Sequence, residues 1–385
     1  MQVIFLLFLI SLSKSIYAYP NFIGFGYTSC LACHYNPFGN GPLTDYGRAV
    51  GATSIADDVL YSKSTSLEER GKKSGFLFSE PINDWLRPSL NYRGLYLQRD
   101  AGTELSQDEV IHMDGNLMLT LKLGPKSNKD KFIATATIGY APTPRNQSSE
   151  EDVPNYRTRE HYIGYRINEN WGLYAGLMDK VYGIRIPDHN AYARSITQNT
   201  MNDQTHGVLL HYTSPKVDIG IQPYLGNLGE ESNVRQIGGA GTFEYTVNNQ
   251  FRPGASVQYG SSEFLKAYAY AFHTRAGFGK GNAIMAEIGR RKEEQVLRGL
   301  ESEEAYWMIQ THLLAKKGFF FVNTIEYFKA DIEQNNKTLR WGPGFQYFIV
   351  NGVEIRADLY NSRIFSDLSV SNDVWDLTGQ LHLWF

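Results

Sequence analysis

Short segments in which apolar and polar residues alternate run from Trp85 to the end of the chain. Successive side chains of a β-strand point to opposite faces, so this period of two predicts strands with one apolar and one polar face. The same alternation recurs in widely separated parts of the sequence. Clear examples are LRPSLNYRGLYLQ (86–98), VDIGIQ (217–222), VEIRADLY (353–360) and DLTGQLHLWF (376–385).

About sixteen such segments can be counted, at the length of roughly 10 residues expected of membrane-spanning strands. The connections between them alternate in length, which is the plan of a barrel with short turns at one end and long loops at the other. We therefore expect a mainly β fold, an antiparallel transmembrane barrel of about sixteen strands. The short connections are 168–170, 213–216, 248–250, 315–318 and 350–352, and the longer ones are 141–156, 180–204, 226–233, 292–303, 330–337 and 361–373.

A soluble β-sandwich or propeller is the alternative interpretation of the same pattern. The sequence shows no propeller-like repeat, and a sandwich would have to pack about sixteen strands in pairs. A closed barrel pairs every strand edge more simply. The chain also ends in Phe385 at the close of an alternating strand, which resembles the C-terminal signature of bacterial outer-membrane proteins.

The composition and the N-terminal residues favour an exported β protein over a nucleic-acid-binding protein. The chain of 385 residues is 14% aromatic, has 36 glycines and carries a net charge of −3, which fits β structure and disfavours nucleic acid as a partner. The apolar run 3–10 and the small Ala18 predict a signal peptide over 1–18, because the run is short for a membrane anchor. We expect a haem-type domain over 19–84 and the barrel over 85–385.

The chain contains two cysteines, and both lie in the motif SCLACH. The spacing C-x-x-C-H is that of c-type haem attachment: Cys30 and Cys33 would bond the two haem vinyl groups and His34 would ligate the iron. A redox CxxC pair and half of a zinc site are the alternatives. Four zinc ligands would require further soft ligands, and a thioredoxin-like pair would require a βαβ context.

An exported C-x-x-C-H segment followed by a barrel resembles the monohaem c-type cytochrome–porin fusions of Gram-negative bacteria and, in concept, the porin–cytochrome conduits. The resemblance depends on SCLACHYNPFGNGPLTDYGR (29–48) and on the barrel pattern. It implies an outer-membrane protein with one covalent haem c on the periplasmic side. It also implies electron transfer with periplasmic or extracellular redox partner proteins, and it supplies no substrate.

The residues after the motif suggest how the haem ligand is oriented. Asn36, Gly39 and Gly41 should form a tight loop that brings a backbone carbonyl to the second nitrogen of His34. A short helix should follow, with Thr44 or Asp45 near its cap. Arg48 could pair with a haem propionate, or it could be a solvated surface residue.

The sixth iron ligand is not evident, because residues 35–84 contain neither Met nor His. Tyr19 would become the mature N-terminus, and its α-amino group could bind iron, which resembles cytochrome f. His189 lies in the longest loop, which in porins folds into the barrel, and His206 follows it. A Lys or Tyr from 35–84 and an open five-coordinate iron are the other options.

Three functions remain compatible with the sequence. The first is electron transfer at or across the outer membrane, where one haem cannot span a hydrocarbon core of about 30 Å alone. The second is a porin-like solute channel in which the haem segment is a plug or a redox gate. The third is a haem sensor or a peroxidase-like site. We expect an electron carrier rather than an enzyme.

Overall fold

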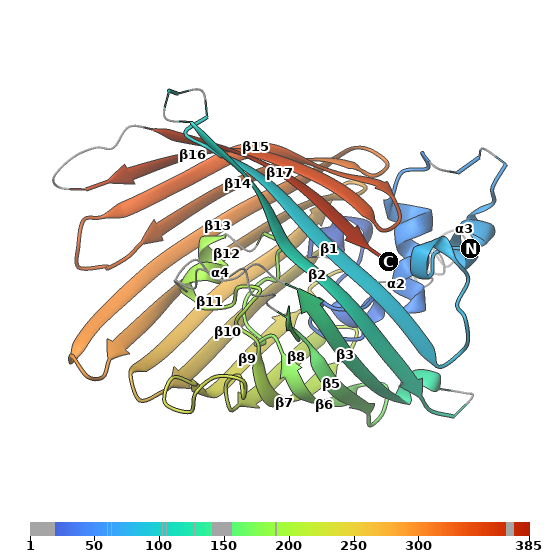
Figure 1. Cartoon of the computed structure of the whole chain (residues 1–385), viewed down its shortest axis with the longest axis horizontal. Helices are drawn as coiled ribbons and strands as arrows, with labels where there is room; N and C mark the ends of the chain where they lie inside the picture. Colours follow the sequence, from blue (N-terminus) through green and yellow to red (C-terminus); the bar gives the residue numbers. More distant parts are fainter. Residues whose placement is uncertain are drawn as a thin grey trace, which may run out of the picture.

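The chain forms a closed antiparallel β-barrel (Figure 1). The computed structural model describes residues 20–385 except 60, 63, 102, 105, 126–127, 141–155, 189–190 and 367–372. Closure follows from β1, which pairs with β2 on one side and with β17 on the other. The strands are β1 (Leu86–Arg99), β2 (Gln107–Leu123), β3 (Phe132–Tyr140), β4 (Tyr156–Arg157), β5 (His161–Arg166), β6 (Trp171–Met178), β7 (Thr205–Thr213), β8 (Val217–Tyr224), β9 (Ile237–Tyr245), β10 (Phe251–Ser261), β11 (Leu265–Phe278), β12 (Asn282–Gln295), β13 (Leu300–Lys316), β14 (Phe319–Lys329), β15 (Lys337–Val350), β16 (Val353–Phe365) and β17 (Val374–Trp384).

The barrel has sixteen strand positions, which confirms the fold expected from the sequence. The short β4 and β5 share one position, because both pair with β3 and only residues 158–160 separate them. Short turns such as 214–216 and 351–352 lie at the same end as the start of β1 and the end of β17. We call this the turn end, and the opposite end the loop end.

The prediction of a long loop over residues 292–303 is wrong. β12 continues to Gln295 and β13 begins at Leu300, so that only a tight turn joins them. The charged residues that were expected in a loop form ion pairs across the two strands, which stabilise the β-ladder. These pairs are Arg290–Glu303 at 2.8 Å, Arg291–Glu304 at 2.9 Å and Lys292–Glu301 at 2.6 Å.

The polar face of the strands points into the lumen and the apolar face points outward. In β8, Asp218 and Gln222 are buried, while Ile221 between them is 56% exposed. The same order holds in β16, where Glu354 and Arg356 are buried and Ile355 is exposed. This is the reverse of a soluble barrel and gives the outer surface that lipid requires. Among the described residues, no helix is both long and apolar enough to cross a bilayer.

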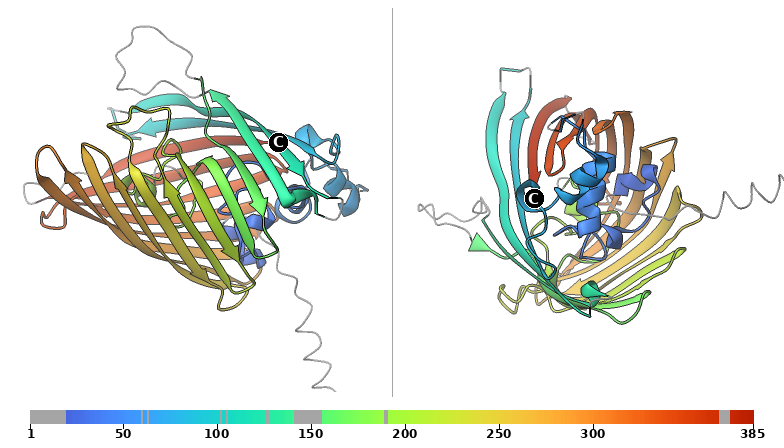
Figure 2. Two further views of the ribbon diagram at one scale, coloured as in Figure 1. Left: turned by 90° about the horizontal axis from the view of Figure 1, so that it is seen from below. Right: turned by 90° about the vertical axis from the view of Figure 1, so that its right-hand side faces the viewer.

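The N-terminal segment lies inside the barrel at the turn end, where Figure 2 shows it within the ring of strands. We call residues 20–59 the plug. The backbone of Gly24 lies directly against the β11–β12 turn, and Gly281 N donates to Gly24 O at 2.8 Å. The helices are η2 (Pro20–Phe25), η3 (Cys30–Ala32), α2 (Asp45–Val50), η4 (Gly51–Ile55), α3 (Leu67–Lys72), η5 (Phe76–Phe78), η6 (Lys129–Lys131) and α4 (Tyr192–Ile196).

An apolar cluster attaches the plug to the wall. Phe22 packs against Phe348 with ring centroids 5.9 Å apart, and Phe25 packs against Phe320 at 6.3 Å. Each buried aromatic ring removes a large apolar area from water. The plug is therefore part of the core of the molecule and not a separate globular unit beside the barrel.

The described part of the longest connection also lies inside the barrel, as the resemblance to porins implies. We call residues 179–204 the lumen loop. Ile184 N donates to Glu287 Oε2 at 2.6 Å and Tyr192 N donates to Glu326 Oε1 at 2.9 Å. These carboxylates belong to the wall strands β12 and β14, so they fix the lumen loop across the barrel interior.

Candidate functional site

The C-x-x-C-H motif forms a tight turn inside the lumen. Cys33 N and His34 N both donate to Cys30 O, at 3.1 and 3.0 Å. His34 then makes a β-bridge with Leu43. The connecting loop reverses through Gly39, Asn40 and Gly41, three successive residues with positive φ, a conformation that glycine and asparagine adopt at the lowest cost.

Helix α2 begins directly against this turn. Thr44, one of the two cap candidates, is its N-cap, because Thr44 Oγ1 accepts a hydrogen bond from Gly47 N at 3.0 Å. The same hydroxyl donates to Ala32 O at 2.8 Å, and Thr44 N donates to Cys33 O at 2.8 Å. The cap of α2 therefore fixes the backbone of the motif.

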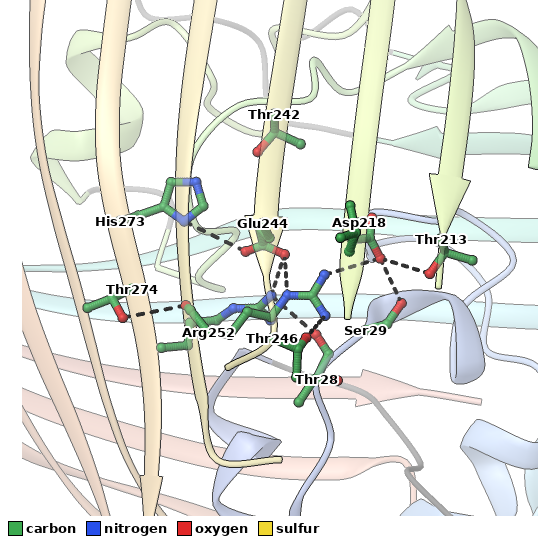
Figure 3. Close-up of polar contacts among 12 residues, drawn as sticks. Thr28, Ser29, Thr213, Asp218, Thr242, Glu244, Thr246, Arg252, His273 and Thr274 are labelled. Carbon is green, nitrogen blue, oxygen red and sulfur yellow. Dashed lines mark hydrogen bonds and ion pairs between the residues drawn. The ribbon is translucent and has the colours of Figure 1, made fainter. Parts of the chain in front are cut away.

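The residues just before Cys30 are bound to charged side chains of the wall (Figure 3). Ser29 Oγ donates to Asp218 Oδ2 at 3.2 Å, and Arg275 Nη2 donates to Thr28 O at 3.3 Å. Arg252 bridges Asp218 and Glu244, and Arg275 also pairs with Glu244 at 2.6 Å. This buried network determines where the motif lies in the lumen.

A large cavity lies between the plug and the lumen loop. Part of this cavity is open to solvent, and both polar and apolar side chains line it. From the plug, Cys30, His34 and Arg48 line it. From the lumen loop, Arg185 and Arg194 face the same space.

The imidazole of His34 has the state that an axial ligand needs. Burial lowers the pKa of His34 to about 4, and hydrogen bonding to the backbone of Gly41 and Asn40 offsets only part of this effect, so the ring is neutral near pH 7. Its Nδ1 is buried and has no hydrogen-bond partner among the described residues. A neutral imidazole is the form in which histidine binds a metal.

The two cysteines differ in their surroundings. Cys30 lines the cavity, and burial raises the pKa of its thiol, which disfavours the reactive thiolate of a redox CxxC pair. Cys33 is fully buried in the apolar cluster with Phe22 and Phe348 and is not among the residues that line the cavity. Cys30 and His34 therefore fit a haem in this cavity, whereas attachment through Cys33 requires its side chain to turn out of the cluster.

Arg48 is buried and not solvated. It is 5% exposed and donates through Nη2 to Pro88 O and to Ser89 Oγ, both at 2.9 Å. Its Nε has no partner among the described residues. Arg48 thus fastens α2 to β1 while it faces the same cavity as His34.

Two of the three candidates for the sixth ligand, Tyr19 and His189, lie outside the described residues. The third, His206, is not a cavity residue. It belongs to β7, and its Nε2 lies 3.2 Å from His161 Nε2. Because His206 Nδ1 accepts a hydrogen bond from Leu228 N at 3.0 Å, the neutral ring carries its proton on Nε2, so this nitrogen has no lone pair for iron. Within the described chain, no group of three His, Cys, Asp or Glu side chains forms a metal site.

The sequence analysis did not identify several residues that complete the cavity. Arg159 and Glu160 reach the lumen from the break between β4 and β5, and Asp179 reaches it from the end of β6. Asn36 Nδ2 donates to Glu160 Oε1 at 3.1 Å, and Asn40 Nδ2 donates to Asp179 Oδ2 at 2.8 Å. The run RTRE (157–160) within an otherwise alternating segment was the available signal.

The fold is that of known outer-membrane porins. The chain matches OmpT of Vibrio cholerae with a TM-score of 0.60 at 8% identity, over 79% of this chain and 99% of that one. It matches an anion-selective porin from Comamonas acidovorans with a TM-score of 0.57 at 9% identity (78% and 99%) and the outer membrane channel DcaP of Acinetobacter baumannii with 0.56 at 11% (78% and 97%). At such low identity the likeness establishes the fold alone.

Sequence comparison, unlike the comparison of folds, assigns the chain to no family. No protein-family model matches the chain, and no curated protein matches it either.

Proposed function

We propose that this protein is a porin-like barrel of the Gram-negative outer membrane whose plug carries a covalently bound haem c and governs passage through the lumen. The observation that carries the proposal is the place of the C-x-x-C-H motif. Cys30 and His34 line a cavity inside the barrel, and the His34 Nδ1 is buried there without a partner among the described residues.

The outer-membrane location is supported by the outward-facing strand residues. Exposed apolar side chains such as Leu119, Ile163, Phe243 and Ile355 follow the outer face of the barrel, and lipid is the environment in which such a surface is stable. The turn end, with the plug, would face the periplasm. Both the plug and the lumen loop occupy the interior, so solutes would not pass without a change in one of them.

In this proposal Cys30 and Cys33 bond the haem through thioethers and His34 is the proximal ligand. The haem, when bound, supplies a one-electron redox centre. The chain orients it: the wall fixes the Thr28–Ser29 segment, and α2 fixes the backbone of Cys33. The apolar cluster around Phe22 keeps water from the buried side of the motif.

Electron transfer is the second candidate function, and the rigid attachment of the plug favours it. The plug is hydrogen-bonded to Asp218 and Glu160 of the wall and to Asp179 at the start of the lumen loop, so a haem bound there would stay at a fixed position in the lumen. A single haem cannot cross about 30 Å of hydrocarbon. Partner cytochromes in the periplasm or outside the cell would therefore be required.

An optical spectrum of the purified protein before and after acid–acetone extraction tests the proposal. We expect colour that stays with the protein, loss of covalent haem in Cys30→Ser, and an altered spectrum in His34→Ala. The control His206→Ala should leave the spectrum of the wild type unchanged. Protein that carries no covalent haem would overturn the proposal and leave a porin-like barrel with a plug.

The same preparations separate the two candidate functions. Conductance across a planar bilayer that changes between the oxidised and the reduced protein would support a gated channel. No measurable conductance in either state, together with reduction by a small c-type cytochrome, would support electron transfer.

A further inference from the structure

Four arginines line the cavity from different parts of the chain. We call Arg93, Arg159, Arg185 and Arg194 the arginine cluster. They come from β1, from the break between β4 and β5, and from the lumen loop, and all four line the cavity. The pKa of Arg159 and that of Arg185 are both lowered to about 10, first by burial and then by neighbouring positive charges: Arg157 and Arg93 act on Arg159, and Arg194 acts on Arg185. Their charges are therefore close enough to repel.

Five other largely buried arginines are paired with carboxylates, whereas Arg48 donates to neutral acceptors. The described pairs are Arg252 with Asp218 and Glu244, Arg275 with Glu244, Arg291 with Glu304, Arg340 with Glu326, and Arg356 with Asp358. This pairing is what a buried guanidinium ordinarily requires.

Two members of the arginine cluster, Arg93 and Arg194, depart from that pattern. Arg93 donates to Pro187 O at 3.3 Å, and Arg194 donates to Ile186 O at 2.7 Å and to Asn199 O at 2.9 Å. These acceptors are neutral, and within the described chain neither arginine has a carboxylate within 4 Å. Arg159 lies 3.7 Å from Asp114, whereas Arg185 has a close partner in Asp179 at 2.8 Å.

Buried polar atoms without partners lie around the same space. Among the described residues, Arg93 Nε and Arg159 Nε have no hydrogen-bond acceptor, and Arg159 is only 8% exposed. The acceptors Asp114 Oδ1, Asn116 Oδ1 and Glu160 Oε2 on the same lining have no donor either. An unsatisfied buried donor is costly. Of the charged side chains that line the cavity, five are arginines and three are carboxylates, counting Arg48 with the cluster. The excess positive charge calls for an anion.

The lining also indicates what kind of anion would fit. Met118, Ile186 and Pro187 line the cavity beside the arginines, so the site combines apolar surface with guanidinium groups. Such a mixture suits an organic anion better than an inorganic one, because the carbon skeleton can pack while the carboxylates accept paired N–H donors.

We propose that the arginine cluster is a binding site for carboxylate groups of an organic anion in the lumen. This inference deepens the proposed function, since it names the chemistry that the cavity accepts. The carboxylates could come from a free dicarboxylic acid that enters the barrel or from the propionates of a haem held at His34. The test below distinguishes these two sources.

The test is calorimetric titration of succinate into the detergent-solubilised full chain. Each charge-assisted hydrogen bond to a carboxylate contributes an amount that corresponds to roughly tenfold to hundredfold in affinity. We therefore expect Arg93→Gln and Arg194→Gln each to weaken succinate binding by about that factor. The matched control Arg290→Gln removes the same charge from an exposed pair with Glu303 and should leave binding unchanged.

Arg194 also fixes the lumen loop, so its replacement could disturb the fold. Arg93→Gln tests the site from the wall, and circular dichroism of both variants reports whether the barrel is intact. Arg194→Lys keeps the charge without the planar fork and should retain part of the affinity.

A double variant, Cys30→Ala with Cys33→Ala, separates the two sources because it cannot hold a covalent haem. Succinate binding to both the wild type and the double variant would identify a free solute. Binding to the double variant alone would identify the propionates as the native occupant. No binding to either protein, or equal weakening by Arg290→Gln, would overturn the inference.

Failure of the inference and failure of the proposed function give different results. Colourless wild-type protein that binds succinate would refute the haem proposal and leave the carboxylate site standing. Covalent haem in the wild type, together with a double variant that does not bind succinate, would support the haem proposal and refute the carboxylate site.

Discussion

At the scale of single residues, the position of the motif depends on how closely α2 approaches it. A Cβ placed on Gly47 would lie 2.4 Å from the backbone oxygen of Cys33, far inside contact distance. Gly71 in α3 is also a helical glycine, but there the nearest atoms would be 3.8 Å away. Both glycines lie in helices, but Gly47 has no space for a Cβ whereas Gly71 does.

We expect Gly47→Ala to destabilise the protein by about 1–3 kcal/mol, because the added methyl group has no room against Cys33. Gly71→Ala should instead stabilise it by about 0.4–1 kcal/mol, because alanine restricts the unfolded chain and fits the helix. The urea midpoints of the two variants in detergent provide the measurement. A Gly47→Ala variant as stable as Gly71→Ala would contradict the packing described for α2.

At the scale of elements, the break between β4 and β5 brings wall residues to the plug. If these strands were continuous, residues 158–160 would continue the β-ladder. Instead Glu160 turns inward, is 2% exposed and accepts a hydrogen bond from Asn36. Burial raises the pKa of Glu160 to about 7, although Arg185 and Asn36 lower it.

This raised pKa makes the stability depend on pH. Between the ordinary pKa of 4.5 and about 7, the folded protein binds a proton at Glu160 that the unfolded chain does not, so the free energy of unfolding falls as pH rises. The stabilisation is complete below pH 4.5 and lost above about 7. The full difference amounts to about 3 kcal/mol.

Glu160→Gln should remove this component, since the amide cannot ionise and still accepts the hydrogen bond from Asn36. The urea midpoint between pH 4 and 8, measured for the wild type and the variant, isolates the effect as a difference. Glu333→Gln, in the exposed β14–β15 connection, is the control for loss of a charge. Parallel curves for wild type and Glu160→Gln would show that Glu160 is ionised in the fold.

The same element shows what the sequence can and cannot predict. The alternation in 217–222 or 353–360 depends only on neighbours in the chain, so the strands and the barrel were predictable. The spacing of Cys30, Cys33 and His34 predicts haem attachment, and this stays a prediction. The convergence of Arg93, Arg159 and Arg194 was not, because it depends on closure of β1 onto β2 and β17 and on where the lumen loop crosses.

At the scale of the whole molecule, the plug is fastened to the barrel in two kinds of place. Deep contacts join Ser29 to Asp218, whose carboxylate also binds His211 at 2.8 Å and Arg252 at 3.2 Å. Rim contacts join Asp57 to Lys316 at 3.1 Å, where the lysine side chain is 62% exposed. The deep contacts are buried and the rim contacts are exposed to solvent. We therefore expect the two kinds of contact to contribute differently to keeping the lumen closed.

Breaking a buried ion pair leaves an uncompensated charge and costs about 3–5 kcal/mol, whereas an exposed pair contributes about 0–1 kcal/mol. Asp218→Asn and Asp57→Asn each remove one carboxylate and keep the shape of the side chain. We expect Asp218→Asn to loosen the plug and raise the conductance of the barrel in a planar bilayer. Asp57→Asn should conduct as little as the wild type.

Salt concentration provides a second check on the same argument. Exposed pairs are screened within about 10 Å at 0.1 M salt, and buried pairs much less. If the deep contacts control the plug, the conductance of the wild type, divided by the conductivity of the salt solution, should stay low as salt is raised to 1 M. A rise in wild-type conductance at high salt would contradict this argument, and so would an equal rise in Asp218→Asn and Asp57→Asn. Either result would mean that the rim contacts hold the plug and that it is only loosely bound.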